Sequence, residues 1–199
     1  METIHYPHFP PHLSRAYIAL FTSVTNAGAL RSRIINAATL EGIEGDRERE
    51  AVNFAFVDAR LITSELHIKT AVYQAILAEA LGALRTKTVH SEILWALNPS
   101  NNISEAIRRY GVSDACTSLL VIRIDSPELQ GVQEKMEAVV SGQMVPLAHL
   151  SSLVDWASVK KYNKLNQEVA IKAASGDPER EHSVIDNIVV SSVAMKSVM

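Results

Sequence analysis

Short continuous runs of apolar residues punctuate this chain, and they predict a small sheet. Residues 16–21 and 119–124 have strand length, and the second run is rich in β-branched side chains. Residues 54–57 predict a short strand, and the run 93–97, ended by an Asn-Pro pair, predicts a central strand. The Pro- and His-rich first residues predict an extended edge strand followed by a loop.

Between these runs, helical spacing and helix-start residues predict several helices. The alanine-rich stretch 64–84 predicts a long one, and the Ser-Pro-Glu sequence from Ser126 predicts a helix running to about Val140. Asn26 and Asn102 are expected to cap the helices that follow them. Further helical stretches are expected around 102–110, 148–156 and 158–174.

The last stretch carries four apolar residues on one helix face: Ile185, Ile188, Val189 and Val193. Its valine content would also permit a strand, but the spacing favours a helix. The polar stretches 41–53 and 173–182 are expected to be mobile surface loops, the first alternatively an extended helix end. The predicted fold is a single α+β domain over 1–199, with a small mainly antiparallel sheet, several packed helices and a C-terminal amphipathic helix.

Composition narrows the class of protein. Of the 199 residues, 47% are apolar and 21% charged, which is typical of a folded domain that buries a core. The net charge of −3 argues against a globally basic nucleic-acid coat but allows a local basic edge. The single cysteine excludes an intramolecular disulfide, and neither a signal peptide nor a membrane-spanning run is visible. We therefore expect a reducing location, nucleus or cytoplasm, without a membrane partner.

Catalytic motifs are missing from the sequence. It has no phosphate-binding glycine loop, no nucleophile elbow and no paired-histidine zinc helix. Three histidines lie among residues 5–12, but prolines interrupt them and no acid or thiol completes a metal site. Cys116 would need His90 or His149 nearby to act as a nucleophile, and a small buried residue is the commoner role. We expect no catalytic residue, no cofactor and no metal.

The most informative segment begins at Arg85 and Lys87. This basic pair precedes the apolar run 93–97, and a loop of Asn, Pro and Ser at 98–102 follows the run and leads into a helix. The start of a helix presents unpaired N–H groups and a partial positive charge, which favour a phosphate. The alternative is structural: Asn102 caps the helix, its apolar residues pack, and the two cations are solvated.

Four stretches, in order, resemble one family: the small kinase-binding subunit of the KEOPS (EKC) complex. They are 54–62, the Thr-Ala-Val-Tyr sequence at 70–73, 85–111 and 118–124. The stretch 85–111 is the most specific, because it combines the basic pair, Ser-Glu, the apolar run and Asn-Ile-Ser-Glu-Ala. The resemblance covers nearly the whole chain, and it departs from the family in the longer stretches 41–53 and 173–182.

The resemblance implies a protein without catalytic activity of its own. It implies binding to the complex's small atypical kinase through the last helix, with Ile185, Ile188, Val189 and Val193 as contacts, and through the kinase a link to the threonylcarbamoyl transferase subunit. It also implies help in recruiting tRNA by its single-stranded CCA end, for threonylcarbamoyladenosine (t6A) modification. In some eukaryotes the complex is further linked to telomere maintenance, chromosomes and transcription.

For the RNA contact, the expected residues are Arg85, Lys87, Asn101, Asn102 and Ile103. Long cationic side chains would reach the phosphates, and Ile103 would offer an apolar surface to an unstacked base. The next cluster to consider is that of Lys160, Lys161 and Lys164.

Two other functions compete with this one. The loop at 98–102 could serve a stand-alone nucleotide-handling enzyme, or the chain could be a chromosome-associated interaction protein that acts without RNA.

Overall fold

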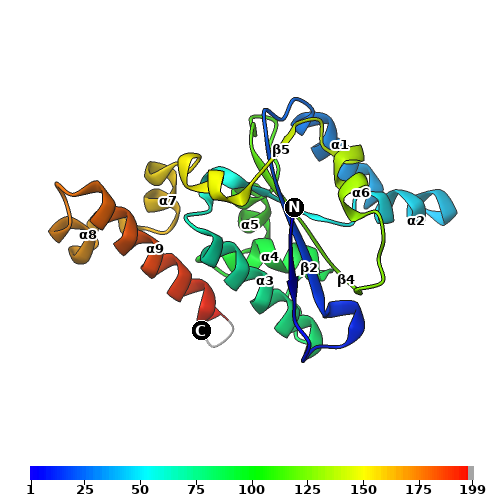
Figure 1. Ribbon diagram of the computed structural model, residues 1–199, viewed down its shortest axis with the longest axis horizontal. Helices are drawn as coiled ribbons and strands as arrows, with labels where there is room; N and C mark the ends of the chain where they lie inside the picture. Colours follow the sequence, from blue (N-terminus) through cyan, green and yellow to red (C-terminus); the bar gives the residue numbers. More distant parts are fainter. Residues whose placement is uncertain (197–199) are drawn as a thin grey trace. The chain divides into compact units, whose positions relative to one another are not determined.

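The computed structural model describes residues 1–196, and the chain forms two compact units (Figure 1). The sheet unit comprises residues 1–58 and 111–147. The helical unit comprises residues 59–110 and the described chain from 148 onward. The predicted α+β class is confirmed, because one unit holds a small antiparallel sheet and the other holds helices.

Five strands make up the sheet of the sheet unit, all paired antiparallel. They are β1 (Glu2–His5), β2 (Arg15–Thr22), β3 (Ala55–Asp58), β4 (Leu119–Asp125) and β5 (Gln143–Val145). Their order is β1-β2-β4-β3, and β5 pairs with β2. In the central pair, Ile18 lies opposite Ile122 and Leu20 opposite Leu120. The strands predicted at 16–21, 54–57 and 119–124, and the N-terminal edge strand, are therefore confirmed.

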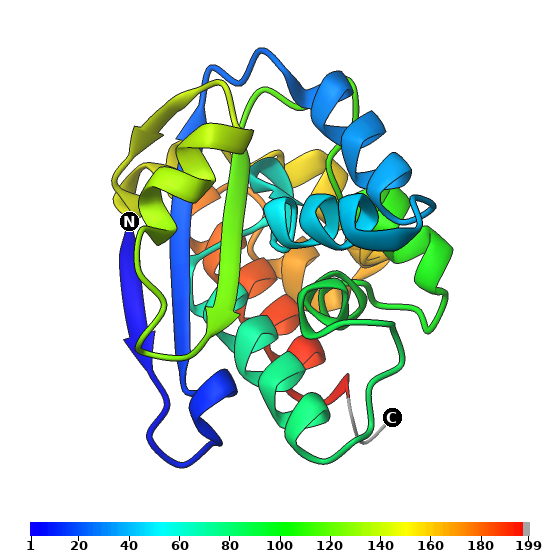
Figure 2. The ribbon, with the colours of Figure 1, turned by 90° about the vertical axis from the view of Figure 1, so that its right-hand side faces the viewer.

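Helices α1 (Ala27–Ala37) and α6 (Val132–Val139) contribute to the apolar core of the sheet unit (Figure 2). The core joins Phe21 and Phe56 of the sheet to Leu30 of α1 and Met136 of α6, all buried. Figure 2 also shows β1, β2 and β4 running side by side. Burial of these side chains supplies the main driving force for this packing.

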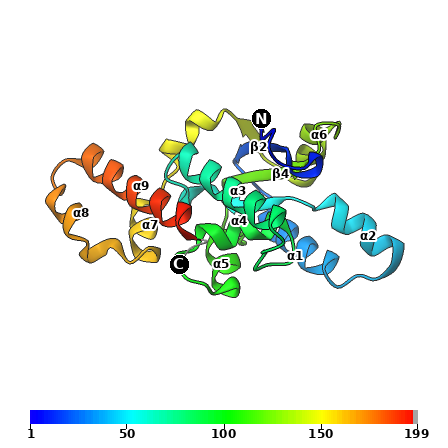
Figure 3. The same ribbon diagram turned by 90° about the horizontal axis from the view of Figure 1, so that it is seen from below.

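The stretch 41–53, expected as a mobile loop or helix end, is mostly helix α2 (Gly42–Ala51), which forms a helical hairpin with α1 (Figure 3). Its charge run forms ion pairs, such as Arg33 Nε to Glu48 at 2.8 Å. Gly45 allows the close turn, because a Cβ there would lie 2.3 Å from the Leu40 carbonyl oxygen. Paired charges thus make a polar helix where the sequence alone suggested solvation.

Two helix starts in the sheet unit differ from expectation. The helix predicted from Ser126 begins only at Val132, because the Ser126 hydroxyl accepts from Glu128 N and forms a local turn. Asn26 does precede α1, but its side chain caps nothing there. Its amide instead donates to Val139 O and accepts from Ser141 N, both at 2.9 Å.

Six α-helices form the helical unit in the described chain: α3 (Glu65–Ala80), α4 (Val89–Leu97), α5 (Ile103–Tyr110), α7 (Trp156–Tyr162), α8 (Val169–Ala173) and α9 (Pro178–Ala194). Short 3-10 turns lie at Ala59–Leu61, Leu147–Ser152 and Leu165–Gln167, and a further one, Pro11–Leu13, belongs to the sheet unit. Helix α3 packs against α4 and α9, and α4 packs against α5. The long helix predicted at 64–84 and the short one at 102–110 are confirmed.

The central strand predicted at 93–97 is wrong, because this run is the second half of α4. Thr88 caps the helix: its hydroxyl accepts from Ser91 N at 3.1 Å, and Ser91 Oγ accepts from Thr88 N at 3.2 Å. Seven of the nine residues of α4 are buried. A helix buried nearly all round carries no polar face, so its apolar run resembles a central strand.

The helices expected at 148–156 and 158–174 are shorter and broken. A 3-10 turn, Leu147–Ser152, occupies the first, and α7, a second 3-10 turn and α8 share the other. Lys164 has a φ of 59°, a left-handed conformation that ends α7. In the stretch 173–182, α9 already begins at Pro178, with the Asp177 carboxylate accepting from Arg180 N at 3.2 Å.

Candidate ligand pocket and partner helix

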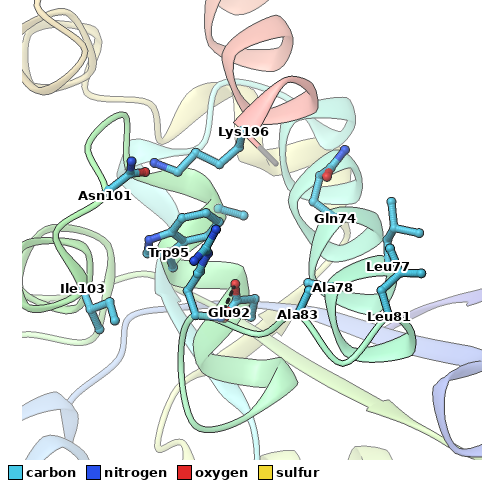
Figure 4. Close-up of a pocket in the computed structure, with 12 residues that line it drawn as sticks. Gln74, Leu77, Ala78, Leu81, Ala83, Glu92, Trp95, Asn101, Ile103 and Lys196 are labelled. Atoms are coloured by element: carbon cyan, nitrogen blue, oxygen red, sulfur yellow. Dashed lines mark hydrogen bonds between the residues drawn. The ribbon is translucent and has the colours of Figure 1, made fainter. Parts of the chain in front are cut away.

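A pocket of about 600 Å³ opens in the helical unit (Figure 4). Its apolar wall comes from α3, the turn after it and α4, with Leu77, Ala78, Leu81, Ala83, Trp95 and Ala96. Its polar lining consists of Gln74, Arg85, Glu92, Asn101 and Lys196. Ile103, at the start of α5, completes it. The volume lies in the range of pockets that bind small organic ligands, and apolar walls with few polar groups are typical of them.

Glu92 shapes the turn that enters α4. Its buried carboxylate accepts hydrogen bonds from Arg85 N at 3.0 Å, Thr86 N at 2.8 Å and Thr86 Oγ1 at 2.6 Å. Main-chain donors therefore solvate this charge, and the turn folds back over the first turns of α4. Arg85, which this turn carries, lines the pocket, and its guanidinium forms no ion pair within residues 1–196.

A hydrogen-bond network holds the opposite loop, 98–102. The buried Asn98 amide donates to Ser100 O at 3.1 Å, and the Ser100 hydroxyl bonds to the Glu105 carboxylate. Asn102 Oδ1 accepts from Glu105 N at 2.9 Å, so the predicted cap is confirmed. The hydrogen bond from Ser100 is the main cause that lowers the pKa of Glu105. The loop is thus preorganised before any ligand arrives.

Lys196 joins this loop to the end of α9. Only 4% of the residue is exposed, and its Nζ donates to Asn98 O at 2.7 Å and Ser100 O at 2.8 Å. The ammonium lies 4.6 Å from the centroid of the Trp95 ring. Both side chains line the pocket drawn in Figure 4. Burial lowers the pKa of Lys196.

The structure brings together three of the five residues expected to contact RNA. Arg85, Asn101 and Ile103 all line the pocket. Lys87 is exposed but does not line it, and Asn102 is occupied as a helix cap. Sequence reasoning missed Trp95, Glu92 and Lys196, and only the Thr88 capping signal could have placed the first two on a helix.

Helix α9 was expected to contact a partner through four residues. Three of them, Ile185, Val189 and Val193, are at most 2% exposed and belong to the core of the helical unit. Ile188 is half-buried, and with Val184 and the 54% exposed Met195 it forms a stripe along one flank of the helix. We call these three residues the outer stripe of α9. The predicted kinase contacts of all four original residues stay a prediction.

A buried polar cluster anchors α9. The Thr63 hydroxyl donates to Asp186 Oδ1 at 2.6 Å and lies 3.1 Å from His67 Nδ1. Burial lowers the pKa of His67 to about 4, so its ring is neutral near pH 7. One turn earlier in the helix, the Trp156 and His182 rings stack with their centroids 3.9 Å apart. These contacts fix the orientation of the outer stripe.

Cys116, the candidate nucleophile noted in the sequence, lies in the core of the sheet unit. Cys116 is buried and donates to Asp58 Oδ2 at 3.3 Å, and burial raises the pKa of its thiol, which suits a small core residue. Within residues 1–196, no cluster of three or more His, Cys, Asp or Glu is arranged to hold a metal ion. No helix in the same range is long and apolar enough to cross a membrane.

Together these features define an α+β protein with an apolar, partly basic pocket and an amphipathic last helix suited to a protein partner. The chain belongs to the family of kinase binding proteins CGI-121, whose family model matches residues 21–197.

Named relatives support this assignment. The EKC/KEOPS complex subunit CGI121 of Cryptococcus neoformans var. neoformans serotype D is 35% identical, over 97% of this chain and 100% of the relative. Its counterpart in Aspergillus fumigatus is 34% identical over 83% of this chain and 84% of the relative. The Neurospora crassa subunit is 30% identical over 98% of both chains.

Proposed function

We propose that this chain is a non-catalytic subunit of the EKC/KEOPS complex. In this role it binds the small atypical kinase of the complex and helps recruit tRNA, by its CCA end, for t6A modification. Family membership and the names of the relatives support the kinase and the complex. One observation carries the RNA part: Arg85 before α4 and Asn101 and Ile103 after it meet in one pocket.

The proposal includes further partners and locations. Through the kinase the chain reaches the threonylcarbamoyl transferase subunit, and it acts in the nucleus and cytoplasm. Where the complex works at chromosomes, the same subunit takes part in telomere maintenance and transcription. These roles follow from the resemblance to the family.

The outer stripe of α9 is the surface that we assign to the kinase. The inner face of the helix is already used, because Ile185, Val189 and Val193 pack inside the helical unit. Val184, Ile188 and Met195 remain accessible at helical spacing. An amphipathic helix that presents a second apolar stripe is a common element for protein docking.

Substitution of the two faces of α9 tests this assignment. Ile188→Arg should weaken kinase binding at least tenfold, measured by calorimetry with the purified kinase, while the fold is retained. Val193→Arg should unfold the helical unit, because a buried position cannot accommodate an unpaired charge. Ser183→Arg, at an exposed position of the same helix, is the matched control and should change neither property. Full kinase affinity in a folded Ile188→Arg variant would refute the outer stripe as the interface.

The pocket has the chemistry that a single-stranded RNA end requires. Trp95 and the apolar wall suit an unstacked base, and the cations Arg85 and Lys196 suit phosphates. Asn101 adds an amide that can read a base edge. A mildly acidic protein can bind such an end, because only a few charges are needed at one place.

RNA binding with matched variants tests the pocket. The chain should bind tRNA with an intact CCA end more tightly than tRNA lacking it, measured by fluorescence anisotropy. Ile103→Glu and Arg85→Glu should weaken binding of the intact tRNA about tenfold, whereas Ile107→Glu, one turn further along α5 and outside the pocket, should not. Lys87→Glu should have a smaller effect than Arg85→Glu, because Lys87 does not line the pocket.

A different outcome would point elsewhere on the chain. If tRNA affinity is unchanged in folded Ile103→Glu and Arg85→Glu proteins, the RNA site lies outside the pocket. Lys161 and Lys164 would then be tested first, because both are exposed, whereas Lys160 pairs with Glu181 at 2.6 Å. Equal binding with and without CCA, together with retained partner binding, would favour an interaction protein that acts without the RNA end.

The competing enzyme function is tested with nucleotide. We expect no ATP turnover and no saturable ATP binding at micromolar concentration by the isolated chain, since the sequence has no phosphate loop. Any effect on ATP hydrolysis should require the kinase. Saturable binding of ATP to the chain alone would favour the nucleotide-handling enzyme instead.

A further inference from the structure

The end of the partner helix is itself a part of the pocket. Lys196, directly after α9, lines the pocket and donates to two carbonyl oxygens of the loop 98–102. Gln74, another lining residue, donates through Nε2 to Ala194 O at 2.9 Å. Met195, between these two contacts, belongs to the outer stripe. The same few residues therefore face the surface assigned to the kinase on one side and the pocket on the other.

The surroundings of Lys196 are unusual for a buried cation. No carboxylate lies within ion-pair distance of its ammonium in the part of the chain that the structure describes. An ammonium has three donors, and the carbonyls of Asn98 and Ser100 use two of them. One donor and an uncompensated charge remain beside the Trp95 ring in a pocket. Such a group is arranged to receive an anionic ligand.

We infer that Lys196 couples the two sites: kinase binding on the outer stripe of α9 strengthens RNA binding in the pocket, and the reverse. This inference rests on the proposed function and adds a regulation to it. Lys196 acts as a positioning residue, because it holds the loop that presents Asn101 and leads to Ile103. Its charge also contributes to the affinity for phosphate.

The physical basis of the coupling is the ordering of a helix end. The last turn of a helix frays more readily than its middle, because its carbonyls lack intrahelical partners. A kinase that contacts Met195 restrains this turn further, and an RNA end that contacts Lys196 restrains the same turn. Whichever partner binds first meets that entropic cost, so the second binds more tightly without any change of shape. Linkage requires the effect to be equal in both directions.

A binding cycle with the full-length chain tests the inference. The Kd of a tRNA transcript ending in CCA is measured with and without saturating kinase, for the natural chain and for Lys196→Met. We expect kinase to tighten RNA binding by about fivefold or more in the natural chain. In Lys196→Met the effect should fall below about twofold. Methionine keeps the apolar stem and removes the ammonium, so kinase affinity itself should stay within about twofold.

A second measurement does not depend on RNA. Hydrogen exchange of the amides in the loop 98–102 should slow on kinase binding in the natural chain, and this protection should be lost in Lys196→Met. Lys172→Met, at an exposed lysine of α8, is the matched control and should behave as the natural chain in both measurements.

The possible outcomes separate this inference from the proposed function. The inference is overturned if the natural chain and Lys196→Met show equal coupling. It is also overturned if neither measurement detects coupling in the natural chain. Both results leave the two binding activities standing. Loop protection by kinase in the absence of any RNA binding refutes the proposed RNA role and the coupling with it, and leaves only a mechanical link between α9 and the loop 98–102. A chain that does not bind the kinase at all overturns the proposed function and the coupling together.

Discussion

Two buried cations, one in each unit, have opposite surroundings. Arg123, on β4 of the sheet unit, is 5% exposed and donates to the carboxylates of Asp125 at 2.7 Å and Glu50 at 2.9 Å. Lys196, in the helical unit, is 4% exposed, and among residues 1–196 its ammonium donates only to carbonyl oxygens. Each also lies near an aromatic ring, Phe54 for Arg123 and Trp95 for Lys196.

The difference separates a structural charge from one that a binding site can use. Two carboxylates compensate the charge of Arg123, and its Nη1 donates to Asn53 O at 2.7 Å, so no uncompensated charge is left for a ligand. Carbonyl dipoles hold Lys196 in place, and no carboxylate in the described part of the chain compensates its charge. Burial alone therefore does not mark a functional cation; burial without a counter-ion, beside a pocket, does.

The largest expected effect comes from Arg123. Arg123→Met should destabilise the protein by about 3 kcal/mol, because it leaves Asp125 and Glu50 without their shared partner. Urea unfolding followed by circular dichroism measures the change. Arg47→Met, at an exposed position of α2, should stay within about 0.5 kcal/mol of the natural chain. If Arg123→Met has an equally small effect, Arg123 is not the structural cation of this comparison.

The buried anion of the helical unit should follow in size. Glu92→Gln replaces one acceptor oxygen by an amide donor that faces Arg85 N and Thr86 N, and should cost about 2–3 kcal/mol. It should also weaken tRNA binding, since the turn that carries Arg85 loses its support. Urea unfolding and anisotropy measure the two effects, and Glu128→Gln on the surface is the control. A variant that keeps both stability and RNA affinity would show that Glu92 does not shape the pocket.

How far the sequence predicts this fold is visible in two apolar runs. The run in β4 was predicted correctly because its β-branched residues favour a strand. The run in α4 was predicted wrongly as a strand, although Thr88 and Ser91 carried a capping signal just before it. Five apolar residues in a row do not distinguish a buried helix from a buried strand, and here the cap decides.

The pocket was predictable only in its local part. Arg85, Asn101 and Ile103 belong to a segment of 19 residues, and the unusual composition of that segment pointed to them. Lys196 lies 98 residues from Asn98 in the sequence, and no periodicity relates the two. Likewise, spacing identified the apolar face of α9, but only the packing on α3 shows which side of the helix is core.

His67 is a third buried base, and unlike Arg123 and Lys196 it carries no charge near pH 7, so a pH titration extends the comparison to it. The pKa of His67 is about 4 in the folded protein, below the ordinary value of 6.5, because burial outweighs the attraction of Asp186. Between pH 6.5 and pH 4 the unfolded chain binds more protons than the folded chain. The contribution of the neutral His67 ring to the free energy of unfolding is therefore complete above pH 6.5 and is lost as the pH falls toward 4. The loss should reach about 2 kcal/mol by pH 5 and about 3 kcal/mol by pH 4, measured by urea unfolding across this range.

The control for this titration is a matched pair of variants. His67→Gln should flatten the dependence of stability on pH between 6.5 and 4, although its stability at pH 7 is lower. His8→Gln, at an exposed position, should leave the dependence unchanged. An unchanged slope in His67→Gln would mean that other groups govern acid unfolding.

The smallest expected effect tests Lys196 itself. Lys196→Met should change the free energy of unfolding at pH 7 by less than about 1 kcal/mol, because two opposing terms nearly balance. The variant loses the hydrogen bonds to Asn98 O and Ser100 O, but it no longer buries an uncompensated charge.

The dependence of stability on pH tests the same side chain. Because burial lowers the pKa of Lys196, the unfolded chain binds more protons than the folded chain as the pH approaches 10.5. The natural chain should therefore gain stability relative to Lys196→Met when the pH is raised from 7 to 10. A loss above about 2 kcal/mol at pH 7 would make Lys196 as structural as Arg123 and remove the basis for assigning it to a site.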